Sequence, residues 1–433
     1  MADHARSDDP AVQAQLDRLA KLSPGADTLG LERITALLER LGNPHLILPP
    51  VFHVAGTNGK GSTCAVLRAA LEEDGKSVHV YTSPHLVRFN ERIRIAGELI
   101  SDAMLADYLR RVLDHAEGLG ASFFEVTTAV AFLAFHEHPA DACVIEVGLG
   151  GRLDATNVLG TTAASGVAQL GIDHEAFLGS AIEGIAREKA SIACPGRPLV
   201  TLAYPFEVRE TVAETARAAG SYVLREGSDW SCLALPDMLK VVVEGRTIEA
   251  ELPALPGLHQ AQNAGLAIAM LLSQKIVEVS NTALQMAPAK AIWPARLQTL
   301  SAGPLTGRVP GRTVRLDGGH NLSAAEAIAR WLATEPKHVL VVGMLANKDA
   351  AGWIATMAPR AAGLIAVPIP GHDHHSPAEL ALMAEANSLT AVTASNLEQA
   401  MAMAGHFPEA PVLIGGSLYL AGEALRLNRE FPV

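Results

Sequence analysis

The sequence has few cysteines and no long apolar run, and each absence excludes a class of protein. No CxxC pair occurs among the four cysteines of this 433-residue chain, which are Cys64, Cys143, Cys194 and Cys232. Such wide spacing favours reduced thiols over a disulfide framework. No run approaches the ~20 apolar residues of a membrane span, and segment 1–10 has no apolar core typical of a secretory signal. We therefore expect a cytoplasmic protein that does not contact membranes.

The sequence also lacks an excess of basic residues. It has 34 Lys and Arg against 46 Asp and Glu, a net charge of −12, which argues against nonspecific nucleic-acid binding. A local basic site for small anions remains compatible with this balance. With 49% hydrophobic and 18% charged residues, the chain is typical of a globular protein, and its length predicts two or three domains.

The clearest motif lies between an apolar run at 51–55 and a helix-like segment at 63–71. It reads Thr57-Asn58-Gly59-Lys60-Gly61-Ser62. In a strand, glycine-rich turn and helix, backbone N–H groups surround phosphate and the helix N-terminus adds a positive dipole end. The lysine of such a loop reaches the outer phosphates. The motif therefore predicts a nucleoside triphosphate site.

The motif departs from the common P-loop at one position. There the lysine is followed directly by Ser or Thr, whose hydroxyl binds Mg²⁺; here Gly61 takes that position and Ser62 follows it. We therefore expect a hydroxyl for the metal to come from another segment. The alternative is a glycine-rich turn without a ligand, which the flanking strand and helix disfavour.

Polar residues follow two further apolar segments. Segment 143–147 reads as a buried strand that carries Glu146, and segment 163–170 reads as a strand that leads to Asp173-His174. Ligands of open α/β sheets bind at the carboxyl ends of strands, and a Glu in an apolar strand is costly unless it is paired or binds metal. The phosphate loop, Glu146 and His174 together predict an Mg²⁺–nucleotide site.

From about residue 300 the sequence alternates regularly between strand-like and helix-like segments. This alternation predicts a parallel sheet with helices. We therefore expect an ATP-binding domain at 1–294, a hinge at 295–299 and a Rossmann-like domain at 300–433. The segments are strands at 313–317, 339–344, 364–369 and 412–414, and helices at 323–333, 377–386 and 397–404.

Two other polar clusters have a plain interpretation from the residues alone. Arg187-Glu188-Lys189 reads as a solvated helix face with a salt bridge, which we favour over a functional site. His372-Asp373-His374-His375 offers metal ligands, but they are adjacent in a Gly/Pro-flanked loop. A solvated loop is therefore the favoured interpretation there.

Three long motifs carry a resemblance to a known family. They are the P-loop, Ser83-Pro84-His85-Leu86 with Asn90-Glu91-Arg92-Ile93, and the segment from Glu146 to Asn157. Together they resemble the bacterial folylpolyglutamate synthase/dihydrofolate synthase family of the Mur ligase superfamily, over nearly the whole chain. Two departures are small: Gly319 stands where the family usually has Ala, and Ala295 stands where Gly usually precedes the Arg.

The resemblance implies a role for particular positions. Ser83 would supply the metal's hydroxyl, with Glu146 and His174 completing the set, and Lys189 matches a carbamylated lysine, which reverses our preference there. Catalytic roles are implied for Lys60, Lys189, Asp317 and His320. Nucleotide contacts are implied for Asn263, Arg296 and Asp317, and pterin or folate contacts for Thr28, Leu29, Gly30, Leu31, Ser122, Phe123, Phe124, Leu153 and Asp154.

The resemblance further implies an α/β fold, with a P-loop NTPase-type Mur-ligase domain before the smaller C-terminal one. The implied enzyme is an ATP-dependent acid–amino-acid ligase that uses two Mg²⁺ ions. It would join L-glutamate to dihydropteroate and to tetrahydrofolates through an acyl phosphate, as a monomer. Three alternatives stay open: a folylpolyglutamate synthase alone, a ligase of cell-wall precursors, which should lack the Ser83–Leu86 loop, and a regulatory P-loop NTPase that needs no glutamate.

Overall fold

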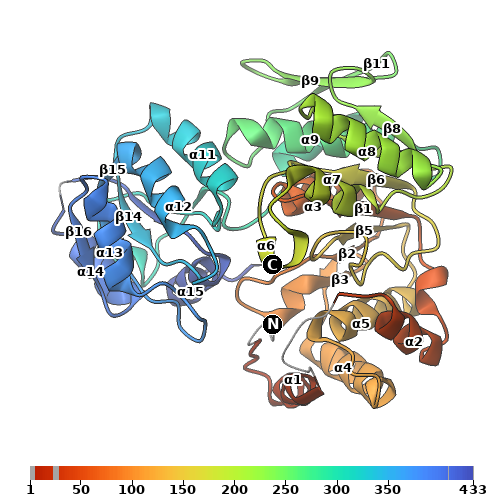
Figure 1. Cartoon of the computed structure of the whole chain (residues 1–433), viewed down its shortest axis with the longest axis horizontal. Helices are drawn as coiled ribbons and strands as arrows, with labels where there is room; N and C mark the ends of the chain where they lie inside the picture. Colours follow the sequence, from red (N-terminus) through yellow and green to blue (C-terminus); the bar gives the residue numbers. More distant parts are fainter. Residues whose placement is uncertain (1–4, 23–28, 408, 433) are drawn as a thin grey trace. The chain divides into compact units, whose positions relative to one another are not determined.

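An eight-stranded sheet organises the larger part of the chain, with the strand order β4-β3-β2-β5-β1-β6-β7-β8 (Figure 1). Strand β1 is central, pairs in parallel with β5 and β6, and is buried along its whole length. Helices cover both faces of such a sheet, so its strands read as continuous apolar runs. The strands are β1 (Val51–Ala55), β2 (Val78–Tyr81), β3 (Ile93–Ile95), β4 (Glu98–Leu99), β5 (Ala142–Glu146), β6 (Ala164–Val167), β7 (Pro198–Thr201) and β8 (Tyr222–Arg225).

Helices pack on this sheet in separate core clusters. One cluster joins the first, second, fourth and fifth helices to β1 and β5, and another joins the seventh and eighth to β1, β6 and β7. A separate antiparallel sheet is formed by β9 (Trp230–Ala234), β10 (Leu239–Val243) and β11 (Arg246–Ala250). The helices are α1 (Pro10–Leu22), α2 (Glu32–Arg40), α3 (Lys60–Glu73), α4 (Asp102–Ala116), α5 (Phe123–Glu137), α6 (Glu175–Leu178), α7 (Ile182–Ala190), α8 (Phe206–Ala218), α9 (Leu258–Leu272) and α10 (Asn281–Lys290).

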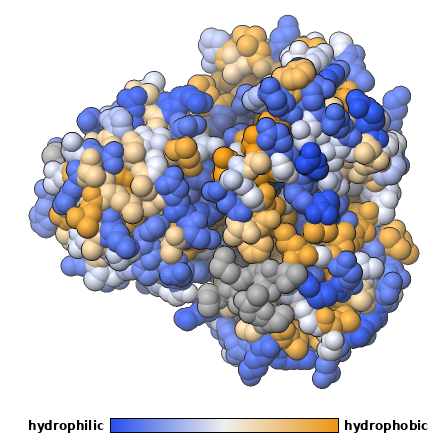
Figure 2. Space-filling model, in the orientation of Figure 1, coloured by the Kyte–Doolittle hydropathy of each residue, from blue (hydrophilic) through white to orange (hydrophobic). Residues whose placement is uncertain are grey.

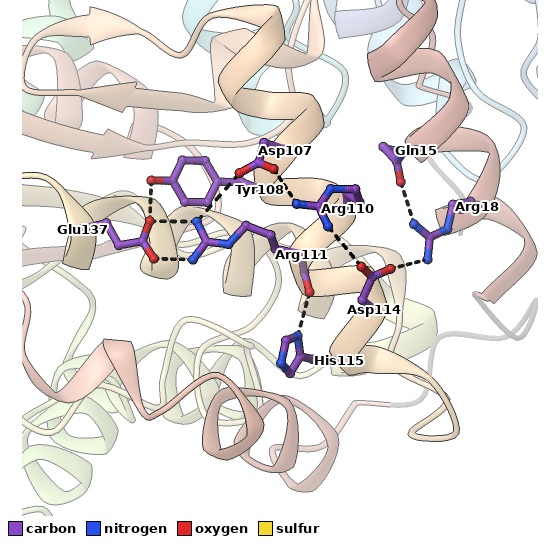
Figure 3. Close-up of polar contacts among 9 residues, drawn as sticks. All are labelled: Gln15, Arg18, Asp107, Tyr108, Arg110, Arg111, Asp114, His115 and Glu137. Atoms are coloured by element: carbon purple, nitrogen blue, oxygen red, sulfur yellow. Dashed lines mark hydrogen bonds and ion pairs between the residues drawn. The ribbon is translucent and has the colours of Figure 1, made fainter.

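Charged side chains connect α4 to its two neighbours (Figure 3). Arg18 of α1 donates to Asp114 of α4 at 2.8 Å. Arg111 of α4 pairs with Glu137 of α5, which also accepts from the Tyr108 hydroxyl at 2.9 Å. Exposed pairs of this kind contribute about 0–1 kcal/mol each. The helices are therefore held mainly by the apolar residues between them, among them Val12, Leu16, Leu109, Val112 and Val130.

The C-terminal part contains a six-stranded sheet in the order β12-β13-β17-β14-β15-β16, parallel except for β12. The predicted α/β fold with a parallel C-terminal sheet is confirmed. The predicted helices 377–386 and 397–404 match α13 and α14. The elements are β12 (Gln298–Thr299), β13 (Val314–Leu316), β14 (His338–Val342), β15 (Ala361–Ala366), β16 (Ala391–Thr393), β17 (Val412–Gly415), α11 (Leu322–Trp331), α12 (Ala350–Met357), α13 (Pro377–Ala386), α14 (Leu397–Ala404) and α15 (Leu418–Asn428).

The structure is a computed structural model that describes residues 5–22, 29–407 and 409–432. The chain divides into a first unit, Met1–Ala254 with Gln260–Ile292, and a second unit, Leu255–His259 with Trp293–Val433. The segment 295–299 belongs to the second unit, and a hinge there stays a prediction. Within the described ranges, no helix combines the length and apolar character needed to cross a membrane. Hydrophilic residues are spread over the face drawn in Figure 2, with apolar residues between them.

Ala295 adopts a backbone conformation that suits glycine. Its φ is 56°, in the left-handed region, and the residue is fully buried. Both of its backbone groups are fixed: its N–H donates to Gln298 Oε1 at 2.9 Å, and its carbonyl accepts from Gly318 N at 3.0 Å. An L-residue in this region costs about 1–2 kcal/mol. The structure therefore explains why glycine is the more usual residue of the family here.

We predict that Ala295→Gly raises the free energy of unfolding of the second unit by about 0.5–1 kcal/mol, since the relief of strain exceeds the entropy cost of glycine. Ala361→Gly is the matched control, because Ala361 is also buried in this unit but has a φ of −90°. The free energy of unfolding of the control variant should fall by about 0.5–1 kcal/mol. Urea unfolding monitored by fluorescence measures both, and destabilisation by both variants would contradict the strain assigned to Ala295.

Candidate functional site

The P-loop connects β1 to α3 by a turn that requires glycine. Gly56 and Gly59 have φ values of 151° and 85°. A Cβ on Gly59 would lie 2.4 Å from Asn263 Oδ1 of α9, and one on Gly56 would lie 2.9 Å from Ala168 Cβ. Both glycines therefore allow a positive φ and a close approach of neighbouring segments.

Residues that follow β6 fix the shape of this loop. The N–H groups of Thr57 and Asn58 both donate to the Gln169 carbonyl, at 2.8 and 3.2 Å. The Asn58 amide also donates to Gln169 Oε1 at 2.8 Å, and Thr57 Oγ1 donates to the Gly171 carbonyl at 2.9 Å. The loop is thus held in place from β6, without help from a ligand.

Two hydroxyl groups at the start of α3 are buried without a hydrogen-bond partner. They are Ser62 Oγ and Thr63 Oγ1, on residues that are 1% and 0% exposed. Buried polar groups of native proteins nearly always have a partner, so an orphaned pair points to a missing ligand. A phosphate group at the helix N-terminus would satisfy such donors. The residues of the loop therefore fit a nucleotide.

Lys60, Glu146 and Ser83 meet at the carboxyl ends of β1, β5 and β2. Lys60 Nζ lies 4.0 Å from Glu146 Oε1 and donates to the Gly56 carbonyl at 3.1 Å. Ser83 N donates to Glu146 Oε2 at 3.3 Å. Glu146 is only 5% exposed, so its carboxylate needs compensating partners, and Lys60 and Ser83 N are among them. The structure thus brings together three residues that the sequence singled out separately.

His174 lies in the segment that follows β6 and Gly171. It is exposed, has a φ of 54° and precedes α6, and its N–H donates to Asp173 Oδ1 at 2.8 Å. In the described ranges, no group of three or more His, Cys, Asp and Glu side chains forms a metal site by itself. A metal at this place would depend on oxygen donors such as the Ser83 hydroxyl and on waters, which suits Mg²⁺. His174 stays a predicted ligand.

Lys189, near the end of α7, is 5% exposed, so the solvated-face interpretation is wrong for this residue. Its burial, followed by the charge of Lys60, lowers its pKa to about 7. The loop after β5 packs directly on this part of α7: a Cβ on Gly151 would lie 2.3 Å from the Glu188 carbonyl and 3.0 Å from Lys189 Cα. The amine is therefore shielded from water beside the predicted phosphate site.

The predicted pterin segments lie near the start of α5. Ser122 caps this helix in a capping box with Glu125, and Arg33 of α2 donates to Glu125 Oε2 at 3.0 Å. Leu29, Gly30 and Leu31, partly buried, lead directly into α2. The Arg33–Glu125 pair therefore connects the two segments, while Thr28 lies outside the described residues.

The two adjacent phenylalanines of α5 have different surroundings. Phe123 is 7% exposed and contacts Phe89 edge-on, with ring centres 6.0 Å apart, so it is a core residue. Phe124 is only partly buried, and its ring lies so close to Gly148 that a Cβ there would be 2.3 Å from Phe124 Cζ. Leu153 is likewise partly buried, in the loop after β5. Phe124 is thus the ring with a face beside this loop.

Gln260 was not assigned a role from the sequence, yet it belongs to this site. It is 2% exposed, its Oε1 accepts from Asn263 Nδ2 at 3.0 Å, and its Nε2 has no partner. Gln260 thereby orients the side-chain amide of Asn263, whose Oδ1 faces Gly59. The helix spacing of three residues between Gln260 and Asn263 was the available signal, because it places both on one face.

In the second unit, Asp317 follows β13 and organises its own turn. Its carboxylate accepts from Leu297 N at 2.8 Å and from Gly319 N at 2.7 Å. Burial raises its pKa, and the nearby charge of Arg296 opposes that change. His320 Nδ1 lies 3.0 Å from the Gly318 carbonyl, to which it can only donate. Arg296 lies in the segment before β12, which is bonded through Ala295 and Leu297 to the turn that carries Asp317 and His320.

The histidines at 372–375 bond to the backbone. His374 Nδ1 lies 2.7 Å from the His372 carbonyl, and His375 Nε2 lies 2.9 Å from the Lys348 carbonyl. The His372 ring stacks on Tyr419 with 3.8 Å between ring centres. These contacts fit a structured, partly exposed loop better than a metal centre.

Comparisons with known proteins agree with this geometry. Residues 298–418 match the family described as Mur ligase, glutamate ligase domain. The dihydrofolate synthase/folylpolyglutamate synthase of Escherichia coli (strain K12) is 37% identical over 349 residues, which cover 78% of each chain.

Solved structures of related enzymes superpose on nearly the whole chain. E. coli FolC in complex with DHPP and ADP has a TM-score of 0.86 and 31% identity, covering 96% of this chain and 97% of that one. A bifunctional folylpolyglutamate synthase/dihydrofolate synthase with Mn, AMPPNP and L-glutamate bound has a TM-score of 0.84 and 30% identity, with the same coverage.

The lowered pKa of Lys189 predicts a pH dependence of stability. Between its folded pKa of about 7 and the higher pKa of an unfolded lysine, the unfolded chain binds the additional proton. The free energy of unfolding therefore rises with pH in this interval, by up to about 1.4 kcal/mol per pH unit. Lys189→Met should remove this rise.

Urea unfolding from pH 7 to 10 in CO₂-free buffer measures the effect as the difference between wild type and variant, in which other groups cancel. Lys240→Met, at an exposed lysine of β10, is the control and should give a constant difference. A constant difference for Lys189→Met as well would show that the Lys189 ammonium is as well solvated in the folded protein as in the unfolded chain.

Proposed function

We propose that this chain, which belongs to the dihydrofolate synthase/folylpolyglutamate synthase family of Mur-type ligases, joins L-glutamate to dihydropteroate and to tetrahydrofolates in the cytoplasm, using ATP. It is an ATP-dependent ligase with a divalent metal, as its relatives are. The single observation that carries the proposal is the convergence of Lys60, Ser83 and Glu146 beside the orphaned hydroxyls of Ser62 and Thr63.

The P-loop residues bind and orient the phosphates. Backbone N–H groups of 59–62 and the N-terminus of α3 surround them, and the hydroxyls of Ser62 and Thr63 donate to phosphate oxygens. Lys60 Nζ, which otherwise bonds to the Gly56 carbonyl, turns to the outer phosphates. It stabilises the charge that develops when the substrate carboxylate attacks the γ-phosphate, the bond to ADP breaks and an acyl phosphate forms. The amine of L-glutamate then attacks the acyl carbon, so that phosphate and a proton leave. Asn263, held by Gln260, is a further proposed nucleotide contact of the first unit, and the nucleotide contacts implied for Arg296 and Asp317, like the catalytic role implied for His320, stay predictions.

Ser83, Glu146 and His174 are the proposed ligands of a first Mg²⁺. When bound, Mg²⁺ neutralises charge on the phosphate oxygens during phosphoryl transfer. The proposal is supported by the contact of Ser83 N with Glu146 and by the burial of this carboxylate at the carboxyl ends of β2 and β5. Lys60 Nζ, 4.0 Å from Glu146 Oε1, would lie beside both this metal and the phosphates.

Lys189 is the proposed site of a carbamate. The ammonium first loses one proton; the neutral amine then attacks CO₂, an N–C bond forms as one C–O π bond opens onto oxygen, and the nitrogen releases a second proton, so that a cation becomes an anion. Burial supports this step, since a pKa of about 7 leaves much of the amine unprotonated at neutral pH. The resulting carboxylate would be a ligand for a second Mg²⁺.

The substrate's flat rings are proposed to lie beside Phe124 and the loop 148–154. An aromatic face that is partly buried over Gly148 is suited to stacking against a pterin or aminobenzoate ring. Dihydropteroate and tetrahydrofolates share these rings and differ in the position of the reactive carboxylate. One ring site therefore serves both reactions, while a synthase of polyglutamates alone would fail to use dihydropteroate.

We predict that Glu146→Gln lowers turnover by about 10²–10³-fold, because the shape is kept while the charge at the phosphates is lost. ADP release at ordinary Mg²⁺ measures turnover, and the thermal unfolding midpoint should change little. Glu226→Gln is the control, since Glu226 is a partly buried carboxylate directly after β8 that accepts from Ala203 N. Near-normal turnover of Glu146→Gln would remove Glu146 from the metal set.

We also predict two glutamate-dependent activities in the purified protein. ADP should be released with dihydropteroate plus L-glutamate, and also with tetrahydrofolate plus L-glutamate. No ADP should be released when L-glutamate is omitted. Phe124→Ala should impair the first reaction more than the second, because the longer substrate has further contacts. Activity with tetrahydrofolate only would reduce the assignment to a folylpolyglutamate synthase, and glutamate-independent turnover would favour a regulatory NTPase.

A further inference from the structure

A single polar residue, His53, lies in the middle of the apolar central strand. Its ring is 1% exposed, and alternation along β1 places it on the same face as Val51 and Ala55. A polar ring in such a core is costly unless it has a partner. His53 Nε2 lies 2.9 Å from Thr156 Oγ1, which is fully buried. The strand that leads to the P-loop is therefore bonded to the loop after β5.

Thr156 continues this contact to Asp154. Its hydroxyl donates to Asp154 Oδ1 at 2.5 Å, and its N–H donates to the same oxygen at 3.0 Å. Since the hydroxyl has one proton and gives it to the carboxylate, it accepts from His53, which fixes the Nε2–H tautomer. Asp154 Oδ2 accepts from Leu149 N at 2.7 Å. Both carboxylate oxygens are thus used to hold the two ends of the loop 148–156.

The loop held in this way lies on the part of α7 that carries Lys189. Arg152 N donates to the Glu188 carbonyl at 2.9 Å, and its side chain pairs with Glu188 Oε1 at 2.8 Å. The contact at Gly151 leaves no space for a Cβ, because the Glu188 carbonyl would be 2.3 Å away. A change in the position of the loop therefore acts directly on the backbone around Lys189.

We propose that His53 and Thr156 are positioning residues, which hold Asp154 and the turn 148–151 in register with Lys189 through the chain His53–Thr156–Asp154. An apolar side chain at either position would fill the same space but would leave the turn without this anchor. The proposal rests on the proposed function for its kinetic consequences, whereas the anchoring itself is a property of the free protein. None of the phosphate-binding side chains belongs to the chain of contacts.

The test compares Thr156→Val and His53→Leu, which break the chain, with Thr156→Ser, which keeps the hydroxyl, and His53→Gln, which keeps an N–H donor. Thr162→Val is the matched control: Thr162 is 4% exposed, lies outside the loop 148–156, and its hydroxyl lies 3.3 Å from Ser165 Oγ. Two readouts are measured, the kinetics of ADP release and the hydrogen exchange of peptides that cover 148–156.

We expect Thr156→Val and His53→Leu to lower kcat at least tenfold with the KM for ATP within twofold, and to speed exchange at 148–156 at least tenfold. Thr156→Ser, His53→Gln and the control should stay within threefold of wild type in both readouts. Unchanged kcat and unchanged exchange in Thr156→Val would overturn the proposal. If Thr156→Val does not fold while Thr162→Val does, the proposal is tested with His53→Leu, and unchanged kcat and unchanged exchange at 148–156 in that variant would overturn it.

The exchange readout separates this proposal from the proposed function. If wild type shows no glutamate-dependent ADP release, the function fails, yet faster exchange in the two chain-breaking variants still supports the anchoring. If wild type is active and exchange at 148–156 is the same in all variants, the anchoring fails while the function stands. A general loss of protection over the whole first unit, rather than at 148–156, would also contradict a positioning role.

Discussion

The parallel pairing of β1 with β5 and β6 is the constraint on which the candidate site depends. It brings the carboxyl ends of these strands to one edge of the sheet, so the P-loop, Glu146 and the segment before His174 begin from neighbouring points. Strand β2, parallel to β5, adds the Ser83 loop at the same edge. Residues far apart in sequence thus need only short segments to meet, and the phosphate loop receives its shape from β6 before any ligand binds.

Much of the fold was predictable where local signals agree. Helices α13 and α14 were predicted with correct ends, because Ser376 and Asn396 cap them and apolar positions recur along each. Helix α12, strand β16 and the antiparallel sheet β9–β11 were not predicted. Strand β16 has only three residues, none of them buried, so its sequence has no apolar run to recognise. The neighbours that stabilise such elements are distant in sequence.

The site was predictable where a motif states the chemistry, as at 57–62, and less so where burial decides it. Arg187-Glu188-Lys189 reads as a solvated face, and Arg187 is indeed exposed. Lys189 is buried because Gly151 lets the loop after β5 reach α7 without a side chain between them. The residue spacing within α7 does not indicate that another segment covers Lys189. The same holds for Gln260 and His53. Gln260 is recognised from its buried Nε2, which has no hydrogen-bond partner, and His53 from the contact of its Nε2 with Thr156 Oγ1.

The charged groups around Lys60 and Lys189 influence one another. The Lys60 ammonium lies near enough to Lys189 to lower the pKa of the latter further, while Asp154 and Asp173 act in the opposite direction. Asp154, Asp173 and Glu188 are the carboxylates that act on Lys189, and Asp154 also holds its own loop. A bound triphosphate would add negative charge beside Lys60. A carbamate on Lys189 would replace one of the two cations with an anion. That anion could then bind a divalent metal beside the phosphates. An anionic phosphate chain and a divalent cation are therefore compatible with the charges of this site, and the carbamate stays a proposal.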